Sequence, residues 1–395
     1  MMYRKFTADA LFTGYEFLTG GEVLVTDEYG KIIEIVSGSG ISDADHFNGT
    51  LSPGFINAHC HLELSWMKNL IPRKTGMIDF LIGVMKMPRL PANEINSAIA
   101  DAEQQMLNSG IIAVGDICNT SLTVPRKKDG NIFYHNFIEA MGFVDSFADQ
   151  RFDQAVKVFN DFASLYPLPV SCNSIVPHSP YSVSQTLFKK IVNFPGNQLL
   201  SIHNQEHVSE NEFFMEGTGD FHRLFQVIGV DSSFHKGSGK TSLQHYLPWF
   251  VNNQKIILVH NVEMGEEDLT FINDMKLNGL ECWLCLCPNA NLFINDKLPD
   301  VLLITRYSEN IIVGTDSLAS NSQLNILEEL KTLHVAFPSL AIRDLLRWAT
   351  VNGAKALNIE EETGSFEKGK QPGIVLIEGL SPGSIMHDAA SSRIL

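Results

Sequence analysis

Basic residues are scarce in this chain of 395 residues. It has 29 Lys and Arg against 45 Asp and Glu, which gives a formal net charge of −16 at pH 7. A surface that binds nucleic-acid phosphates or anionic lipids needs clustered Lys and Arg. The composition therefore argues against a nucleic-acid polymer or a membrane as partner, and it favours an enzyme of small molecules.

Cysteines and long apolar runs are also few. The chain has 6 Cys, far fewer than a disulfide scaffold of this length would carry. No stretch reaches the roughly 18 consecutive apolar residues of a membrane-spanning helix. Polar residues interrupt the N-terminal segment too often for a secretory signal peptide. We therefore expect a cytoplasmic protein with reduced thiols.

The middle of the chain alternates between short apolar runs and amphipathic segments. The eight runs are residues 54–62, 111–119, 134–143, 169–179, 199–206, 255–262, 279–288 and 310–318. Gly110 and Gly279 stand where helix C-terminal glycines belong. This alternation predicts an α/β protein whose residues 53–359 form a (β/α)₈ TIM barrel, with a doubly wound open sheet as the alternative.

Both ends of the chain have the pattern of short strands. Val23–Thr26 and Lys31–Val36 flank a turn and predict a β-hairpin. We predict that residues 1–52 and 360–395 pair in one small β domain. Residues 221–250, between the fifth and sixth runs, are interpreted as a long connection near the barrel mouth. Whether residues 206–250 form a mobile lid is left open.

Four residues at the ends of predicted strands suggest a metal site. His59 and His61 are two residues apart, so a strand directs both rings to one face, and paired imidazoles are half of a zinc site. His203 ends the fifth run and Asp316 ends the eighth. Each alone is more often a packed histidine or a helix cap, but a barrel gathers its active site at these strand ends. Together they predict a metal site.

Other polar residues near the same strand ends are candidates for catalysis and substrate binding. Glu206 follows His203 by three residues and suits the proton transfers that an activated water requires. His178, at the end of the fourth run, is interpreted as a substrate-facing hydrogen-bond donor. Glu63, two positions beyond His61, is a candidate substrate contact. His260 ends the sixth run at the same pole of the barrel.

Three arginines are candidate partners of a substrate carboxylate. Arg73, Arg89 and Arg151 lie in or near predicted βα connections, and we take Arg151 as the candidate. For any one of them a surface position is the simpler interpretation. An anionic substrate would need such a residue, because the overall charge of the protein repels it.

Several segments together resemble the amidohydrolase superfamily. The segments are PGFINAHCHLELS, IHNQE, LVHN, CPNAN, VGTDSLASN and ATVNGAKAL, in that order. The resemblance covers about residues 49–373 and is strongest to the metal-dependent deaminases and chlorohydrolases, including aminofutalosine, adenosine and S-adenosylhomocysteine deaminase-like proteins. It implies a distorted (β/α)₈ barrel with a β-sandwich built from both termini.

The resemblance also implies roles for individual residues. His59, His61, His203 and Asp316 would bind one divalent metal ion, usually zinc, with iron as the alternative. Glu206 would be the proton shuttle, and His260 would polarise the attacking water or the substrate. Binuclear relatives use a Lys at the end of the fourth strand, and the run at 169–179 has none, so a mononuclear site is expected.

The implied reaction is hydrolytic deamination of an adenine-type ring, in which a metal-activated water displaces ammonia. A guanine deaminase or an s-triazine chlorohydrolase or deaminase on the same scaffold is the alternative. Cyclic-amide hydrolysis is less favoured, as is a metal-binding protein without catalysis, since Glu206 and Asp316 are both present. The partner is then a small heterocyclic substrate, and an apolar face at residues 81–87 would suit a homodimer.

A cysteine cluster offers a competing interpretation. Cys282, Cys285 and Cys287 have a metal-like spacing, but the chain lacks the Pro-Cys dipeptide of cytidine-type zinc deaminases. They alternate with apolar residues in a predicted strand, and free Cys is commonly buried. We therefore predict that they pack in the core.

Overall fold

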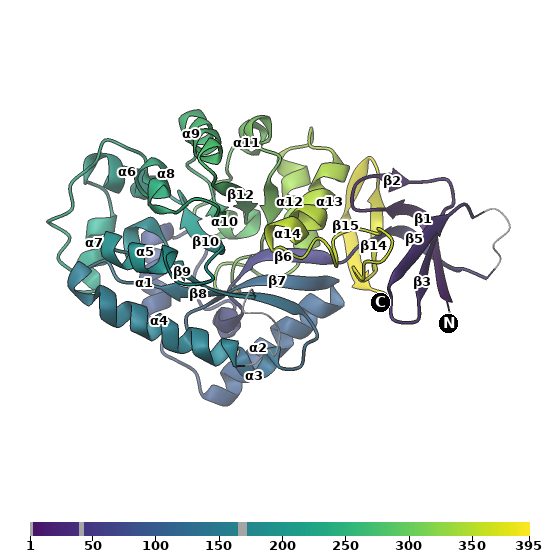
Figure 1. Cartoon of the computed structure of the whole chain (residues 1–395), viewed down its shortest axis with the longest axis horizontal. Coiled ribbons are helices and arrows are strands. Elements are labelled where there is room, and N and C mark those ends of the chain that lie inside the picture. The colour runs from purple at the N-terminus through teal and green to yellow at the C-terminus, as the bar shows by residue number, and fades with distance from the viewer. Residues whose placement is uncertain (1–2, 39–42, 165–171) are drawn as a thin grey trace.

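The computed structural model describes residues 3–38, 43–164 and 172–395 (Figure 1). Eight parallel strands form two four-stranded sheets, ordered β6-β7-β8-β9 and β10-β11-β12-β13. These strands are β6 (Phe55–Cys60), β7 (Ile111–Cys118), β8 (Phe133–Ala140), β9 (Asn173–Pro177), β10 (Leu199–Asn204), β11 (Lys255–His260), β12 (Glu281–Leu286) and β13 (Ile311–Val313). Each predicted apolar run contains one of them, which confirms a mixed α/β fold with parallel strands.

The two parallel sheets meet at both edges. On one side, the amide of His203 in β10 donates to the carbonyl oxygen of His178, just beyond β9, over 3.0 Å. On the other side, Cys60 at the end of β6 forms a parallel bridge with Asp316, beyond β13. Backbone contacts near the carboxyl ends of the strands therefore join the sheets on both sides.

Helices connect the parallel strands and lie around them (Figure 1). They are α1 (Met77–Lys86), α2 (Ala92–Asn108), α3 (Val124–Lys127), α4 (Ala148–Ala163), α5 (Gln185–Val192), α6 (Val208–Glu216), α7 (Phe221–Val227), α8 (Ser242–Tyr246), α9 (Glu266–Leu277), α10 (Pro288–Ile294), α11 (Val301–Tyr307), α12 (Ile326–Ala336), α13 (Ile342–Ala349) and α14 (Val351–Ala356). Gly110 and Gly279 follow α2 and α9 with φ of 94° and 90°, as predicted for glycines that end helices. Within the described ranges, no helix combines the length and apolarity that a membrane crossing requires.

Both ends of the chain contribute to a third sheet. Its order is β15-β14-β5-β1-β3-β4, with β2 paired to β1. The strands are β1 (Tyr3–Phe12), β2 (Phe17–Leu18), β3 (Val23–Asp27), β4 (Ile32–Val36), β5 (Asp45–Ser52), β14 (Val375–Ser381) and β15 (Ser384–Arg393). The predicted hairpin is the antiparallel pair β3 and β4. Strand β14 pairs antiparallel with β5, and Figure 1 shows the yellow C-terminal strands beside the purple N-terminal ones.

A buried ion pair connects helix α3 with the parallel strand β7. Lys127, at the end of α3, is 1% exposed, and its ammonium donates to Asp116 of β7 and to Asn136 of β8. The other oxygen of Asp116 accepts the backbone N–H of Leu62 over 2.8 Å. The pair therefore connects two strands with the residue that follows His61.

Replacing Lys127 with Met should lower the free energy of unfolding by about 3–5 kcal/mol, because Asp116 would keep a buried charge without its partner. Urea unfolding followed by circular dichroism measures the change. Lys128→Met is the matched control, since the side chain of Lys128 is exposed, and it should change stability by less than about 0.5 kcal/mol. Equal effects of the two substitutions would contradict the role of the buried pair.

Candidate active site

Three imidazoles and one carboxylate converge where β6, β10 and β13 end. The Nε2 atoms of His61 and His203 are 3.3 Å apart, and Oδ1 of Asp316 lies 3.4 Å from Nε2 of His61 and 3.6 Å from Nε2 of His59. Two nitrogens that bind one zinc tetrahedrally at about 2.0–2.1 Å stand about 3.3 Å apart. The side chains are therefore spaced as ligands of a single ion.

The hydrogen bonding of the histidines also fits a metal. Both ring nitrogens of His59 and the Nδ1 of His61 are buried and lack a hydrogen-bond partner among the described residues, although buried polar groups are normally paired. The Nδ1 of His203 lies 2.7 Å from the carbonyl oxygen of His178, so it carries the proton. The lone pair of Nε2 in His203 is then free for an ion.

The backbone is strained where these side chains enter the site. His260 and Asp316 have φ of 77° and 57°, in the left-handed region that non-glycine residues rarely occupy and that is enriched at functional sites. Gly314, just before Asp316, passes so close to His59 that a Cβ would lie 2.8 Å from its carbonyl oxygen. Only glycine permits this approach, which brings Asp316 to the histidines.

Glu206 and His260 face each other beside the four candidate ligands. Oε2 of Glu206 is 3.6 Å from Nε2 of His260. The amide Nδ2 of Asn291 donates to Nδ1 of His260 over 3.0 Å, so the neutral ring carries its proton on Nε2. Burial lowers the pKa of His260 to about 3. Burial, followed by the charges of Asp316 and Glu210, raises the pKa of Glu206 well above its usual range.

The structure brings His178 beside this cluster. Its ring packs against that of His203 with centroids 4.6 Å apart, and its Nδ1 lies 2.8 Å from Oε1 of Glu139, at the end of β8. The His178 side chain is 16% exposed. A substrate contact through His178 therefore remains consistent with its position, and it stays a prediction.

Glu63 has a different environment from the one expected. Its carboxylate is 4% exposed and accepts the backbone N–H groups of Asn119 and Thr120 and the hydroxyl of Thr120. Burial raises the pKa of Glu63 to about 7. The side chain thus holds the loop that follows β7, and nothing in its contacts supports a direct meeting with substrate.

The contacts of Arg73 and Arg151 do not include the histidines or carboxylates of the candidate metal site. Arg151 is exposed on α4, packs over Gly142 and donates to Gln154 over 3.5 Å. Arg73 stands over the ring of Phe293, 5.1 Å from its centroid. The contacts of Arg151 give no support to the prediction that it binds substrate.

Two buried residues of the site were missed in the sequence. Glu139 lies inside the third run, next to the last residue of β8, and Asn291 lies in α10. A charged residue near the end of a predicted strand is the kind of signal that identified Asp316, so Glu139 was detectable. Asn291 contacts His260 from a helix 31 residues further along the chain. It ends the segment CPNAN, but that segment alone does not indicate a contact with His260. The cysteines Cys282, Cys285 and Cys287 are buried, as predicted.

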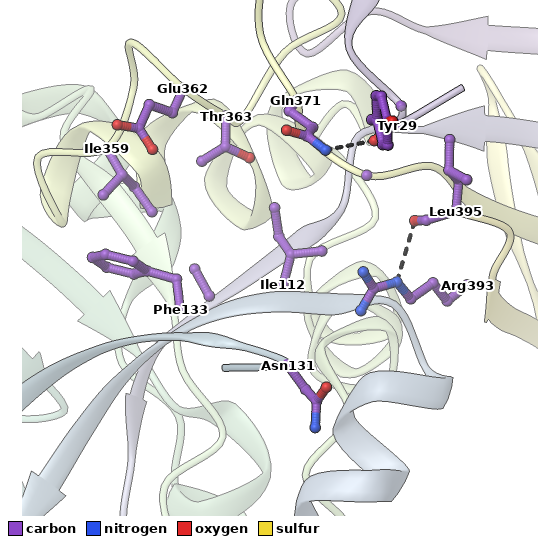
Figure 2. Close-up of a pocket in the computed structure, with 13 residues that line it drawn as sticks. Tyr29, Ile112, Asn131, Phe133, Ile359, Glu362, Thr363, Gln371, Arg393 and Leu395 are labelled. Carbon is purple, nitrogen blue, oxygen red and sulfur yellow. Dashed lines mark hydrogen bonds between the residues drawn. The ribbon is translucent and has the colours of Figure 1, made fainter. Parts of the chain in front are cut away.

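One cavity lies at the amino ends of the parallel strands. A cavity of about 410 Å³ is lined by Ile112 and Phe133 from the beginnings of β7 and β8, and by Tyr29, Gln371 and Arg393 from the terminal segments. Figure 2 shows Ile112 and Phe133 on one side of it and Tyr29 and Gln371 on the other. It therefore lies at the ends of the strands opposite the histidines.

A second cavity lies on the side of the histidines. It measures about 440 Å³, and its lining includes Phe143, Pro180, Phe234, His245 and Trp249. Phe143 and Pro180 belong to the loops that follow β8 and β9. The connection between β10 and β11, predicted as a long segment, contains α6, α7 and α8 and supplies Phe234, His245 and Trp249.

The fold and this cluster agree with comparisons to known proteins. The chain belongs to the amidohydrolase family, whose model matches residues 50–393. It is 27% identical to an adenosine deaminase of Helicobacter pylori, over 90% of this chain and 88% of that protein. It is 26% identical to a 5-methylthioadenosine/S-adenosylhomocysteine deaminase of Thermoanaerobacter pseudethanolicus, over 85% of this chain and 75% of that protein.

A solved structure shares the fold over the whole chain. The crystal structure of Helicobacter pylori aminofutalosine deaminase in complex with methylthio-coformycin superposes with a TM-score of 0.82. The two sequences are 23% identical, and the match covers 99% of this chain and 100% of that one.

Proposed function

We propose that this chain is a metal-dependent hydrolytic deaminase that removes the amino group of an adenine-type ring as ammonia. The observation that carries the proposal is the cluster of His59, His61, His203 and Asp316 with Glu206 at its edge. Ligand geometry alone would suit a metal-binding protein. A buried carboxyl with a raised pKa beside those ligands suits a proton-transfer catalyst. The named activities of the similar proteins support the choice of ring.

His59, His61, His203 and Asp316 would hold one divalent ion, zinc or iron, because imidazole and carboxylate ligands suit both. A bound ion of this kind supplies a water of lowered pKa, near 7 in zinc enzymes. The absence of Lys from β9 supports a mononuclear site.

Residues of the chain would then carry out the proton transfers. Glu206 holds a proton and delivers it to a ring nitrogen of the substrate, which makes the neighbouring carbon more electrophilic. The Nε2–H of His260 donates to the oxygen of the incoming water. The carboxylate of Asp316 would accept one proton from that water and pass it to the amino group, which leaves as ammonia. The remaining proton of the added hydroxyl would return to Glu206, so that the ring carbon keeps the oxygen as a carbonyl and Glu206 is protonated again.

The same proposal includes the finer architecture. We infer that the two parallel sheets close into a (β/α)₈ barrel over residues 53–359, which the contacts at both sheet edges support. Residues 1–52 and 360–395 would form the accessory β-sandwich around their shared sheet. A homodimer through residues 81–87 and a cytoplasmic location stay predictions.

Ammonia release from purified, metal-loaded protein tests the function. We expect turnover with at least one of adenosine, 5-methylthioadenosine, S-adenosylhomocysteine and aminofutalosine, and none with guanine or an s-triazine. Turnover confined to guanine or a triazine would replace the adenine-type substrate with the alternative on the same scaffold. If the loaded protein releases ammonia from none of these compounds, the deaminase proposal is wrong.

A further inference from the structure

A set of part-buried hydrogen bonds runs along the ends of four neighbouring strands. We call it the rim network, and its members are Glu63, Asn119, Glu139 and His178. Glu63 follows β6 and accepts the backbone N–H of Asn119, just beyond β7, over 2.9 Å. Nδ2 of Asn119 donates to Oε2 of Glu139 over 3.0 Å. Oε1 of Glu139 lies 2.8 Å from Nδ1 of His178.

The network ends at a candidate metal ligand on each side. Glu63 is two residues beyond His61. At the other end, the carbonyl oxygen of His178 accepts both the backbone N–H of His203 and its Nδ1–H. The rim network therefore links the segment after β6, which carries His61, to strand β10, which carries His203, and His178 lies in between.

Glu139 is the central member of the network. It is buried, and a carboxylate can only accept hydrogen bonds. The proton of the His178–Glu139 bond is therefore on Nδ1 of His178. Nε2 of His178 is therefore the ring nitrogen that is available to bind a ligand. The side chain of His178 is partly exposed beside the candidate metal ligands.

The side-chain amide of Asn119 is oriented by Glu139. Its Oδ1 is buried and has no hydrogen-bond partner among the residues that the structure describes. An unpaired buried oxygen is unfavourable. The amide nevertheless directs Nδ2 to Glu139, because a carboxylate requires a donor and would repel Oδ1.

We propose that Glu139 is a positioning residue that fixes the ring and the tautomer of His178, so that Nε2 of His178 faces the substrate. The part of this inference that concerns substrate rests on the proposed function. Outer carboxylates of this kind orient histidines in many sites, and their loss typically costs about 10–100-fold in activity or metal affinity.

A second cation is the competing explanation for the same side chains. Glu139, His178 and His203 each offer an atom within 4.8 Å of the others. However, Nδ1 of His203 already donates to the carbonyl oxygen of His178, and Nδ1 of His178 already donates to Glu139. Hydrogen bonds thus account for these nitrogens without an ion, and metal counting separates the two explanations.

The test compares Glu139→Ala with Glu139→Gln. We expect Glu139→Ala to lower kcat/KM by about 10–100-fold and to keep one metal ion per chain. Gln should restore most of the loss, because its Oε1 can still accept Nδ1–H of His178. Its amide can donate to Oδ1 of Asn119 once the Asn119 amide turns over, since Nδ2 of Asn119 faces this position in the wild-type protein. Glu103→Gln is the control, since Glu103 is buried outside the site and pairs with Arg126. It should change kcat/KM by less than about twofold even where stability falls.

A second readout does not need turnover. Nitrogen-15 chemical shifts of the histidine rings, assigned with His178→Gln, report which ring nitrogen carries the proton. The wild-type protein should show Nδ1 of His178 protonated, and Glu139→Ala should shift the proton toward Nε2. If wild-type protein releases no ammonia, the proposed function fails, while this measurement still decides the role of Glu139.

Three results would overturn the inference. They are unchanged kinetics and shifts in Glu139→Ala, loss of metal from that variant, and a second metal equivalent in wild type that the variant lacks. The first would make Glu139 irrelevant to His178. Loss of metal would mean that Glu139 positions the metal ligand His203. A second metal equivalent that the variant lacks would mean that Glu139 is itself a metal ligand.

Discussion

Glu206→Gln should reduce kcat by about 10²–10⁴-fold, the range that a positioned acid or base contributes. The amide keeps the size and polarity of the side chain but has no proton to deliver to the ring nitrogen. Substrate affinity should change much less than turnover, because the proton is transferred only as the reaction proceeds. Steady-state ammonia release gives kcat, and a direct binding measurement on the inactive variant gives Kd.

Glu267→Gln is the matched control for this substitution. Glu267 is exposed in the first turn of α9, so its variant should keep wild-type kinetics. A Glu206→Gln protein with near-normal kcat would exclude Glu206 as the proton shuttle. A loss confined to Kd would make it a binding residue.

Removing the metal should abolish activity and lower the Tm together. A chelator such as dipicolinate should reduce kcat/KM by more than about 100-fold, since the lowered pKa of the attacking water depends on the ion. An ion that binds only the folded chain adds about 2.7 kcal/mol of stability at 100 times its Kd, so the apoprotein should unfold at a lower temperature. Adding back Zn²⁺ or Fe²⁺ identifies the ion that restores activity.

Elemental analysis completes this test. Wild-type protein should contain one ion per chain, and His61→Ala should contain much less. His387→Ala, at an exposed position in β15, should retain the wild-type content. Full activity in a chelated protein shown to be free of metal would contradict the proposed chemistry.

Much of the candidate site was predictable because a strand places its functional residues by simple rules. His59 and His61 share a face through the two-residue period, and His203 and Asp316 come at the ends of apolar runs that form parallel strands. The strand-like sequences of the two termini predicted that they pair with each other, but not that β14 would lie antiparallel beside β5. The junctions between the two parallel sheets depend on contacts between β9 and β10 and around Cys60, and no local pattern encodes them.

Other features of these segments could not be predicted from the sequence, for a common physical reason. The surroundings of Glu63 and Arg151 depend on how loops and helices pack against the strands. Glu63 lies within reach of the loop after β7, so its carboxylate is fully used there. Lys127 belongs to the segment VPRKKDG, which has the composition of an exposed turn. Its burial follows from the neighbouring Asp116 and Asn136, which come from two different strands.

The sheet shared by both termini has a consequence for synthesis. Strand β5 ends at Ser52 and its partner β14 begins at Val375, so about 300 residues must be translated between them. At roughly 5–20 residues per second, β5 waits about 15–60 s for its partner. During that time one edge of β5 is open to pairing with other chains. A chaperone or the later segments of the chain would need to cover that edge on the ribosome, and slower translation would lengthen the exposure.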